Sequence, residues 1–89
     1  TFSLGTLNGK GWEFFNAGDF LQAINSWNRM LEHYPSFTEG YLNIVYALIE
    51  LNQDYTETLQ KLQENLKSSE FYSAAEKDEI KHEIKELKK

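Results

Sequence analysis

The sequence predicts an all-α protein of five helices, and two observations carry this prediction. Four segments begin with the pattern of a helix-capping box, and each is followed by apolar residues three and four positions apart. The chain also matches itself when it is shifted by 34 or 35 residues. No stretch alternates apolar and polar residues over the length of a strand. We expect antiparallel helices at about residues 5–17, 20–33, 37–51, 55–68 and 73–88.

Length and composition limit the possible classes of protein. The 89 residues leave room for one core, so we expect a single domain over residues 1–89. The absence of cysteine excludes a disulfide framework and a thiolate zinc site. The net charge of −5 argues against nucleic acid as a partner, and no apolar run approaches the ~20 residues that membrane insertion requires. A start at Thr1 without a signal-like segment is expected of a piece of a longer protein or of a processed chain.

The capping boxes place the starts of four helices. In such a box the first side chain accepts a hydrogen bond from the backbone N–H three residues on, and a Glu or Gln reaches back. Pro35 comes directly before the second box, where it ends one helix without breaking the next. The four boxes are Asp19–Gln22, Ser36–Glu39, Asp54–Glu57 and Ser73–Glu76.

Apolar spacing defines a buried side for each helix. The last helix differs, because only one of its sides is apolar (Ala75, Ile80, Ile84 and Leu87) and the other mixes Glu and Lys. This pattern is typical of a cap that closes a stack of helices, and a linker helix leading to a further domain is the alternative. The apolar positions of the other helices are Leu7, Gly11 and Phe14, then Phe20, Ile24, Trp27, Met30 and Leu31, then Tyr41, Ile44, Val45, Leu48 and Leu51, then Tyr55, Leu59, Leu62 and Leu66.

The internal repeat divides the chain into two helix–turn–helix units and a final helix. Repeat 1 covers about residues 4–37, repeat 2 about 38–72, and the capping helix about 73–88. The offset grows from 34 to 35 residues near Asn52, where a turn tolerates an insertion. The matched pairs are Leu7 with Tyr41, Gly11 with Val45, Phe14 with Leu48, Asp19 with Asp54, Ala23 with Thr58, and Trp27 with Leu62.

This pattern resembles the tetratricopeptide repeat, over about residues 4–70. Small residues at Gly11 and Ala23 allow paired helices to approach closely, and we expect these two positions at the closest approach of the first pair. The second repeat is looser, and Lys10 stands where the family usually has Leu. The first repeat carries the pattern as Leu7, Gly11, Phe14, Ala23, Trp27 and Pro35.

The resemblance implies helix pairs stacked as a short right-handed superhelix, with the first helix of each pair lining a concave groove. It implies a protein–protein interaction module that binds a peptide or a helical segment of a partner protein. We expect the groove to be apolar and aromatic, with Glu13, Glu39 and Glu50 as an acidic rim that favours an apolar or basic ligand. The expected partner-binding residues are Asn8, Trp12, Phe15, Asn16, Leu42, Asn43, Tyr46 and Ile49.

Two alternatives stay open at this point. The groove residues could meet a neighbouring helix of the same chain and be core. The module could also be a self-assembly unit that forms a homodimer, since two repeats are fewer than such arrays normally need. Asn43 matches one Asn of the clamp with which chaperone-binding members of the family hold a peptide C-terminus, but Asn8 and Trp12 replace its Lys and second Asn, so we do not expect that ligand.

The sequence offers no catalytic constellation. His33 and His82 have no second ligand at metal spacing, and the glycines form no phosphate-binding loop. We therefore predict that the chain is not an enzyme, with no catalytic residue, no metal site and no cofactor.

Overall fold

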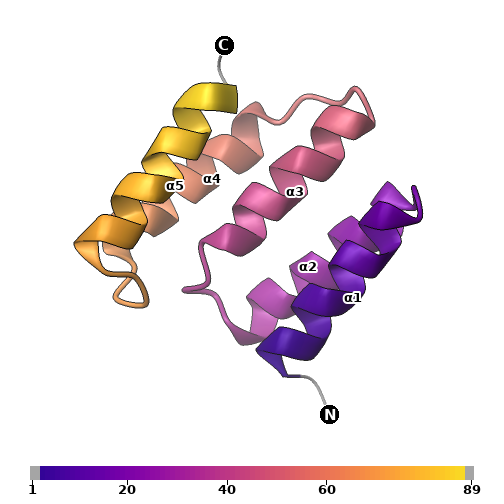
Figure 1. Ribbon diagram of the computed structural model, residues 1–89, viewed down its shortest axis with the longest axis horizontal. Helices are drawn as coiled ribbons and strands as arrows, with labels where there is room; N and C mark the ends of the chain where they lie inside the picture. Colours follow the sequence, from indigo (N-terminus) through magenta and orange to yellow (C-terminus); the bar gives the residue numbers. More distant parts are fainter. Residues whose placement is uncertain (1–2, 88–89) are drawn as a thin grey trace.

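The computed structural model describes residues 3–87, and these residues form five α-helices without a strand (Figure 1). The prediction of an all-α fold is confirmed, and each helix boundary inside the described range lies within two residues of the expected one. The predicted end of the last helix, at residue 88, lies outside the described residues. In the described range, no helix combines the length and the apolar character that crossing a bilayer needs. The helices are α1 Leu4–Asn16, α2 Phe20–His33, α3 Glu39–Glu50, α4 Thr56–Ser68 and α5 Ala74–Leu87.

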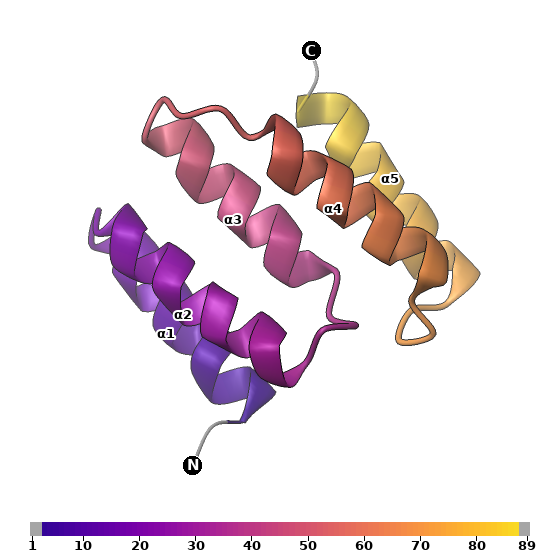
Figure 2. The same ribbon diagram turned by 180° about the vertical axis from the view of Figure 1, so that it is seen from behind.

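The helices form two layers. α1, α3 and α5 make the layer nearer the viewer in Figure 1, and α2 and α4 make the layer nearer the viewer in Figure 2. α1 packs against α2, α2 against α3, and α3 against α4, so consecutive helices are neighbours. α3 lies between the α1–α2 pair at one end of the molecule and the α4–α5 pair at the other.

Two of the predicted capping interactions are present. The backbone N–H of Gln22 donates to Oδ1 of Asp19 at 3.3 Å. At the start of α5 both halves of a capping box form: Glu76 N–H donates to Ser73 Oγ at 3.2 Å, and Ser73 N–H donates to Glu76 Oε1 at 2.9 Å. These bonds satisfy backbone donors that a helix start leaves without partners.

The other two boxes were predicted wrongly. α3 begins with Thr38 at its N-cap, and the side chain of Thr38 makes no capping bond because it donates to Oδ1 of Asn65 at 2.6 Å. Ser36 contributes only its carbonyl oxygen to the turn. Asp54 does accept a backbone hydrogen bond, but from Thr56 two residues on, at 3.0 Å, so α4 begins one residue later than expected.

Side chains of the second pair hold the loop between α2 and α3. Asn65 of α4 donates to the carbonyl oxygen of Pro35 at 2.7 Å while it accepts from Thr38. Ser69, just after α4, donates to the carbonyl oxygen of Ser36 at 2.9 Å. Thr38 and Ser69 are buried, so the bonds of these two side chains are partly shielded from water and help to fix where the second pair sits on the first.

Both helix pairs turn with the same backbone motif. The turn after α1 contains Gly18 with φ of +83°, and the turn after α3 contains Asn52, 34 residues later, with φ of +56°. In each case the following residue donates back across the turn: Asp19 to Phe14, at 2.8 Å, and Gln53 to the carbonyl oxygen of Leu48, at 2.9 Å. The extra residue of the second pair therefore follows this motif, whereas the sequence match of Gly18 with Gln53 placed it before Gln53.

The first pair is closed by a tight contact at Gly11. Gly11 and Ala23 are buried, and Trp27 is fully buried between the two helices. A Cβ atom at Gly11 would overlap the indole ring of Trp27. The indole Nε1 of Trp27 donates to the carbonyl oxygen of Asn8 at 3.4 Å. Gly11 is therefore a point of tight contact between α1 and the Trp27 side chain of α2.

The second pair shares its core with α5. Ile80 and Ile84 of α5 are buried in one cluster with leucines of α3 and α4. Ala75, predicted on the same side of α5, is exposed; five residues turn a helix by about 140°, which carries Ala75 away from Ile80. The other buried members of this cluster are Leu42, Leu59, Leu62, Leu66 and Tyr72.

Candidate protein-binding face

The eight predicted binding residues lie on α1 and α3, in the layer that also contains α5. We call this layer's outer surface the α1/α3/α5 face. Asn43 Nδ2 donates to Oδ1 of Asn8 at 3.1 Å and so joins α3 to α1. Asn43 is buried, which corrects the expectation that it meets a partner. Asn8 is half-buried, and Asn16 is exposed near the end of α1.

Trp12 and Phe15 have one side in the core and one side open. Both rings are half-buried, and they meet edge to face with centroids 5.2 Å apart. Trp12 lies 5.0 Å from the ring of Trp27, and Phe15 lies 5.1 Å from the ring of Phe20. Aromatic pairs at these distances add to the stability of the α1–α2 pair. The two rings therefore support the fold as well as offering contact area.

Leu42 was expected in the groove but belongs to the core. It is 4% exposed and packs in the cluster that contains Ile80 and Ile84, because α5 lies beside α3. Tyr46 borders the same cluster, is half-buried, and donates its hydroxyl to Oε2 of Glu83 at 3.2 Å. Ile49 is 36% exposed, so it remains available on the surface. Trp12 and Tyr46 thus flank two different clusters.

A hollow on this face lies between α3 and α5, with a volume of about 130 Å³. We call it the acidic hollow, since four carboxylates surround its two apolar residues. Its lining residues are Glu39, Leu42, Glu76, Glu79, Ile80 and Glu83.

Sequence reasoning found only one of these four glutamates. Glu39 was placed on the expected rim, but the three on α5 were treated as a solvated side. The signal was present: Glu76, Glu79 and Glu83 are spaced three and four residues apart, which puts them on one face of a helix. The sequence did not show that this side of α5 lies next to α3.

The carboxylates of the hollow influence one another. Burial raises the pKa of Glu39, and the negative charges of Glu83, Glu76 and Glu79 raise it further. Burial and the adjacent Glu83 likewise raise the pKa of the Tyr46 phenol. In contrast, the hydrogen bonds between Glu76 and Ser73 lower the pKa of Glu76. The ionised form of Glu39 is therefore less favourable in the fold than in water, and a cation placed in the hollow would stabilise it.

Tyr72 supports the hollow from beneath. Its hydroxyl oxygen accepts a hydrogen bond from the backbone N–H of Glu39 at 3.2 Å. Burial is the main cause that raises the pKa of Tyr72 to about 12. The phenol therefore stays neutral at physiological pH and holds the first turn of α3 next to α5.

The histidines lie away from this face. His33 is the exposed last residue of α2, and His82 contacts Glu86 with Nε2 3.8 Å from Oε1. Among residues 3–87, no group of three His, Asp or Glu side chains is arranged to hold a metal ion.

Comparison with known proteins gave no relative. No protein-family model matches the chain, and searches of curated proteins and of solved structures found no significant match.

Proposed function

We propose that the chain is a tetratricopeptide-like unit that binds a peptide or a helical segment of a partner protein on its α1/α3/α5 face. In this proposal the two helix pairs are repeats stacked as a short right-handed superhelix, and α5 is the capping helix. The 34-residue offset between Gly18 and Asn52 supports the repeat, because both residues end a helix in the same left-handed turn. The arrangement of α1, α3 and α5 in one layer supports a common binding face.

The observation that carries the proposal is the acidic hollow. Its apolar floor, Leu42 and Ile80, lies among four glutamates, and Tyr46 stands beside it with its hydroxyl on Glu83. A ligand segment that places Lys or Arg among these carboxylates, next to an apolar residue on Ile49, would match both the charge and the exposed surface. The net charge of −5 would also speed the approach of a basic segment.

The aromatic residues are the anchors in this proposal. Tyr46 and Trp12 are half-buried and offer rigid area that loses little entropy on binding. Asn16 and the open part of Asn8 could bond the ligand backbone. Tyr46→Ala should weaken binding by ~2 kcal/mol or more, while Tyr46→Phe keeps the ring and removes only the bond to Glu83.

A binding experiment with charge-matched variants tests the proposal. The probe is a fluorescein-labelled peptide of alternating Leu and Arg residues, followed by fluorescence anisotropy. Glu79→Gln/Glu83→Gln should weaken binding about tenfold, whereas Glu32→Gln/Glu64→Gln, which removes the same charge from exposed positions on α2 and α4, should change it less than about twofold. Equal losses in the two variants would show that only overall charge attracts the peptide. The absence of binding to the unaltered chain would also contradict the proposal.

Self-assembly is the second candidate, because two large apolar side chains are open to solvent. Leu21 of α2 is 62% exposed and Phe71, between α4 and α5, is 57% exposed. Such side chains can mark contact surfaces between copies. Sedimentation of the chain and of Leu21→Ser and Phe71→Ser variants decides this: a dimer that either variant dissociates supports self-assembly, and a monomer at all concentrations excludes it.

A further inference from the structure

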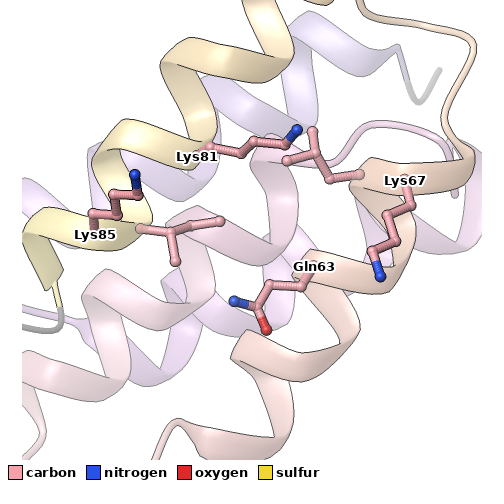
Figure 3. Close-up of a pocket in the computed structure, with 6 residues that line it drawn as sticks. Gln63, Lys67, Lys81 and Lys85 are labelled. Atoms are coloured by element: carbon pink, nitrogen blue, oxygen red, sulfur yellow. The ribbon is translucent and has the colours of Figure 1, made fainter.

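A second groove lies between α4 and α5, away from the acidic hollow (Figure 3). Its volume is about 420 Å³. Figure 3 shows Gln63 and Lys67 on α4 and Lys81 and Lys85 on α5, on the two sides of the opening. We call it the lysine groove, and its lining residues are Gln63, Leu66, Lys67, Lys81, Ile84 and Lys85.

The two helices contribute to this groove with the same spacing. α4 supplies a polar residue, a Leu and a Lys at positions i, i+3 and i+4, and α5 supplies a Lys, an Ile and a Lys at the same interval. Leu66 and Ile84 are 3% and 4% exposed, so they form the floor. The lysines are exposed and form the rim.

The charge of the groove is opposite to that of the chain. No carboxylate lines it, although the chain carries 14 Asp and Glu against nine Lys and Arg. Among the described residues, Lys67, Lys81 and Lys85 take part in no ion pair; the two pairs within 4.0 Å involve Lys61 and His82. Three positive charges on the rim of the groove therefore make no ion pair within 4.0 Å in the described part of the chain.

We propose that the lysine groove docks an acidic amphipathic helix of a partner protein. A furrow between two packed helices with an apolar floor is the shape that receives a third helix. The ligand helix would lay a narrow apolar stripe along the aliphatic stems of the lysines above Leu66 and Ile84, and place Asp or Glu on both flanks, next to the ammonium groups. This surface is separate from the α1/α3/α5 face, so one chain could hold a basic segment on one side of α5 and an acidic helix on the other.

The test uses a labelled peptide of about 18 residues, long enough to form a helix on binding. It carries Leu at helical spacing and Glu on both flanks, and a second peptide replaces each Leu by Gln. The net charge of −5 repels an acidic peptide, so binding of the Leu peptide would report a local basic site. We expect the Leu peptide to bind and the Gln peptide to bind at least about tenfold more weakly.

Charge reversal at the groove is compared with the same reversal elsewhere. Lys81→Glu/Lys85→Glu should weaken binding of the Leu peptide about tenfold, whereas Lys10→Glu/Lys61→Glu, on α1 and on another side of α4, should weaken it less than about threefold. Lys81→Gln/Lys85→Gln keeps most of each stem and serves if the reversal impairs folding; it should weaken binding about threefold. Circular dichroism melting checks that each variant is folded.

Several outcomes would overturn the proposal. These are no binding of the Leu peptide, equal binding of the Gln peptide, or equal losses in the groove and control variants. A dimer of the chain that Lys81→Glu/Lys85→Glu dissociates would show that a second copy fills the groove instead. Glu79→Gln/Glu83→Gln should leave binding of the acidic peptide intact, so failure here is distinguishable from failure of the binding face on α3 and α5.

Discussion

The α1–α2 pair and the α3–α4 pair occupy matching places in the repeat, but different contacts close them. In the first pair Gly11 lets the fully buried Trp27 come against the backbone of α1. In the second pair the matching residues are Val45 and Leu62, both buried with side chains on each partner. The cluster of the first pair is completed by Ile44 and Ala47 of α3, while the cluster of the second pair is completed by Ile80 and Ile84 of α5.

The difference shows how a repeat can lose its small residues and still pack. In the second pair no Gly stands opposite the matching large residue, and the side chains between the helices are covered by a third element. Ile80 and Ile84 of α5 give that cover. Repeat 2 therefore takes its cover from α5, the last described helix, while repeat 1 takes its cover from α3, which lies between the two pairs.

The largest expected effect follows from truncating the two side chains of α5 that cover the cluster of the second pair. Ile80→Ala/Ile84→Ala should lower the free energy of unfolding by about 4 kcal/mol or more, because each truncation leaves a cavity among the leucines of α3 and α4. Chemical denaturation measures the loss. His82→Ala, an exposed change on the same helix, is the control and should alter stability by less than about 0.5 kcal/mol. A small loss in the double variant would mean that α5 is a linker rather than a cap.

The next effect is a difference between two glycines of α1, Gly11 and Gly9. Gly11→Ala should lower the free energy of unfolding by about 2 kcal/mol, because its Cβ would overlap the Trp27 ring. Gly9→Ala meets nothing within 4 Å, so it should raise stability by about 0.5–1 kcal/mol through helix propensity. In thermal and chemical denaturation, we expect the two variants to change the free energy of unfolding in opposite directions. If both raise stability, the tight contact of the first pair does not exist.

The smallest effect concerns the charge of Glu39. The pKa of Glu39 is raised in the fold, which means that the folded chain favours the protonated carboxyl. The stability that this preference adds is fully present below the ordinary Glu pKa and is lost as the pH rises through the raised pKa. Glu39→Gln should therefore be more stable than the unaltered chain at pH 7, by only about 0.3 kcal/mol because solvent screens this exposed residue. The difference should vanish at about pH 3. A variant less stable at pH 7 would show that Glu39 is favourably paired.

Local patterns predicted the helices and the Gly11 contact well. Spacing of three and four residues tells which side chains share a face of a helix, and a lone small residue opposite Trp27 tells where two helices can touch. The capping box at Ser36 failed because its expected donor, the backbone N–H of Glu39, bonds the hydroxyl of Tyr72, and because the side chain of the N-cap residue Thr38 bonds Asn65, 27 residues away. A side chain's choice between a local cap and a distant partner cannot be read from its own segment.

The candidate site was predicted less completely, since it depends on where α5 lies. Periodicity placed Leu42 on the side of α3 away from its own pair, but not under α5. Because the position of α5 could not be predicted, neither could the acidic hollow and the lysine groove, which form on two sides of α5 where it packs beside α3 and α4. The residues of each site that share one helix are regularly spaced in the sequence. Only the structure shows that residues of two helices lie side by side to form each site.

Native-state hydrogen exchange, resolved helix by helix in increasing denaturant, tests the central comparison most directly. The amides of α4 and α5 should open at a lower free energy than those of α1 and α2, because the cluster of the second pair is completed by α5, the last described helix, whereas that of the first pair is completed by α3 and has Trp27 packed on Gly11. Equal opening free energies in all five helices, or earlier opening of α1 and α2, would contradict this account.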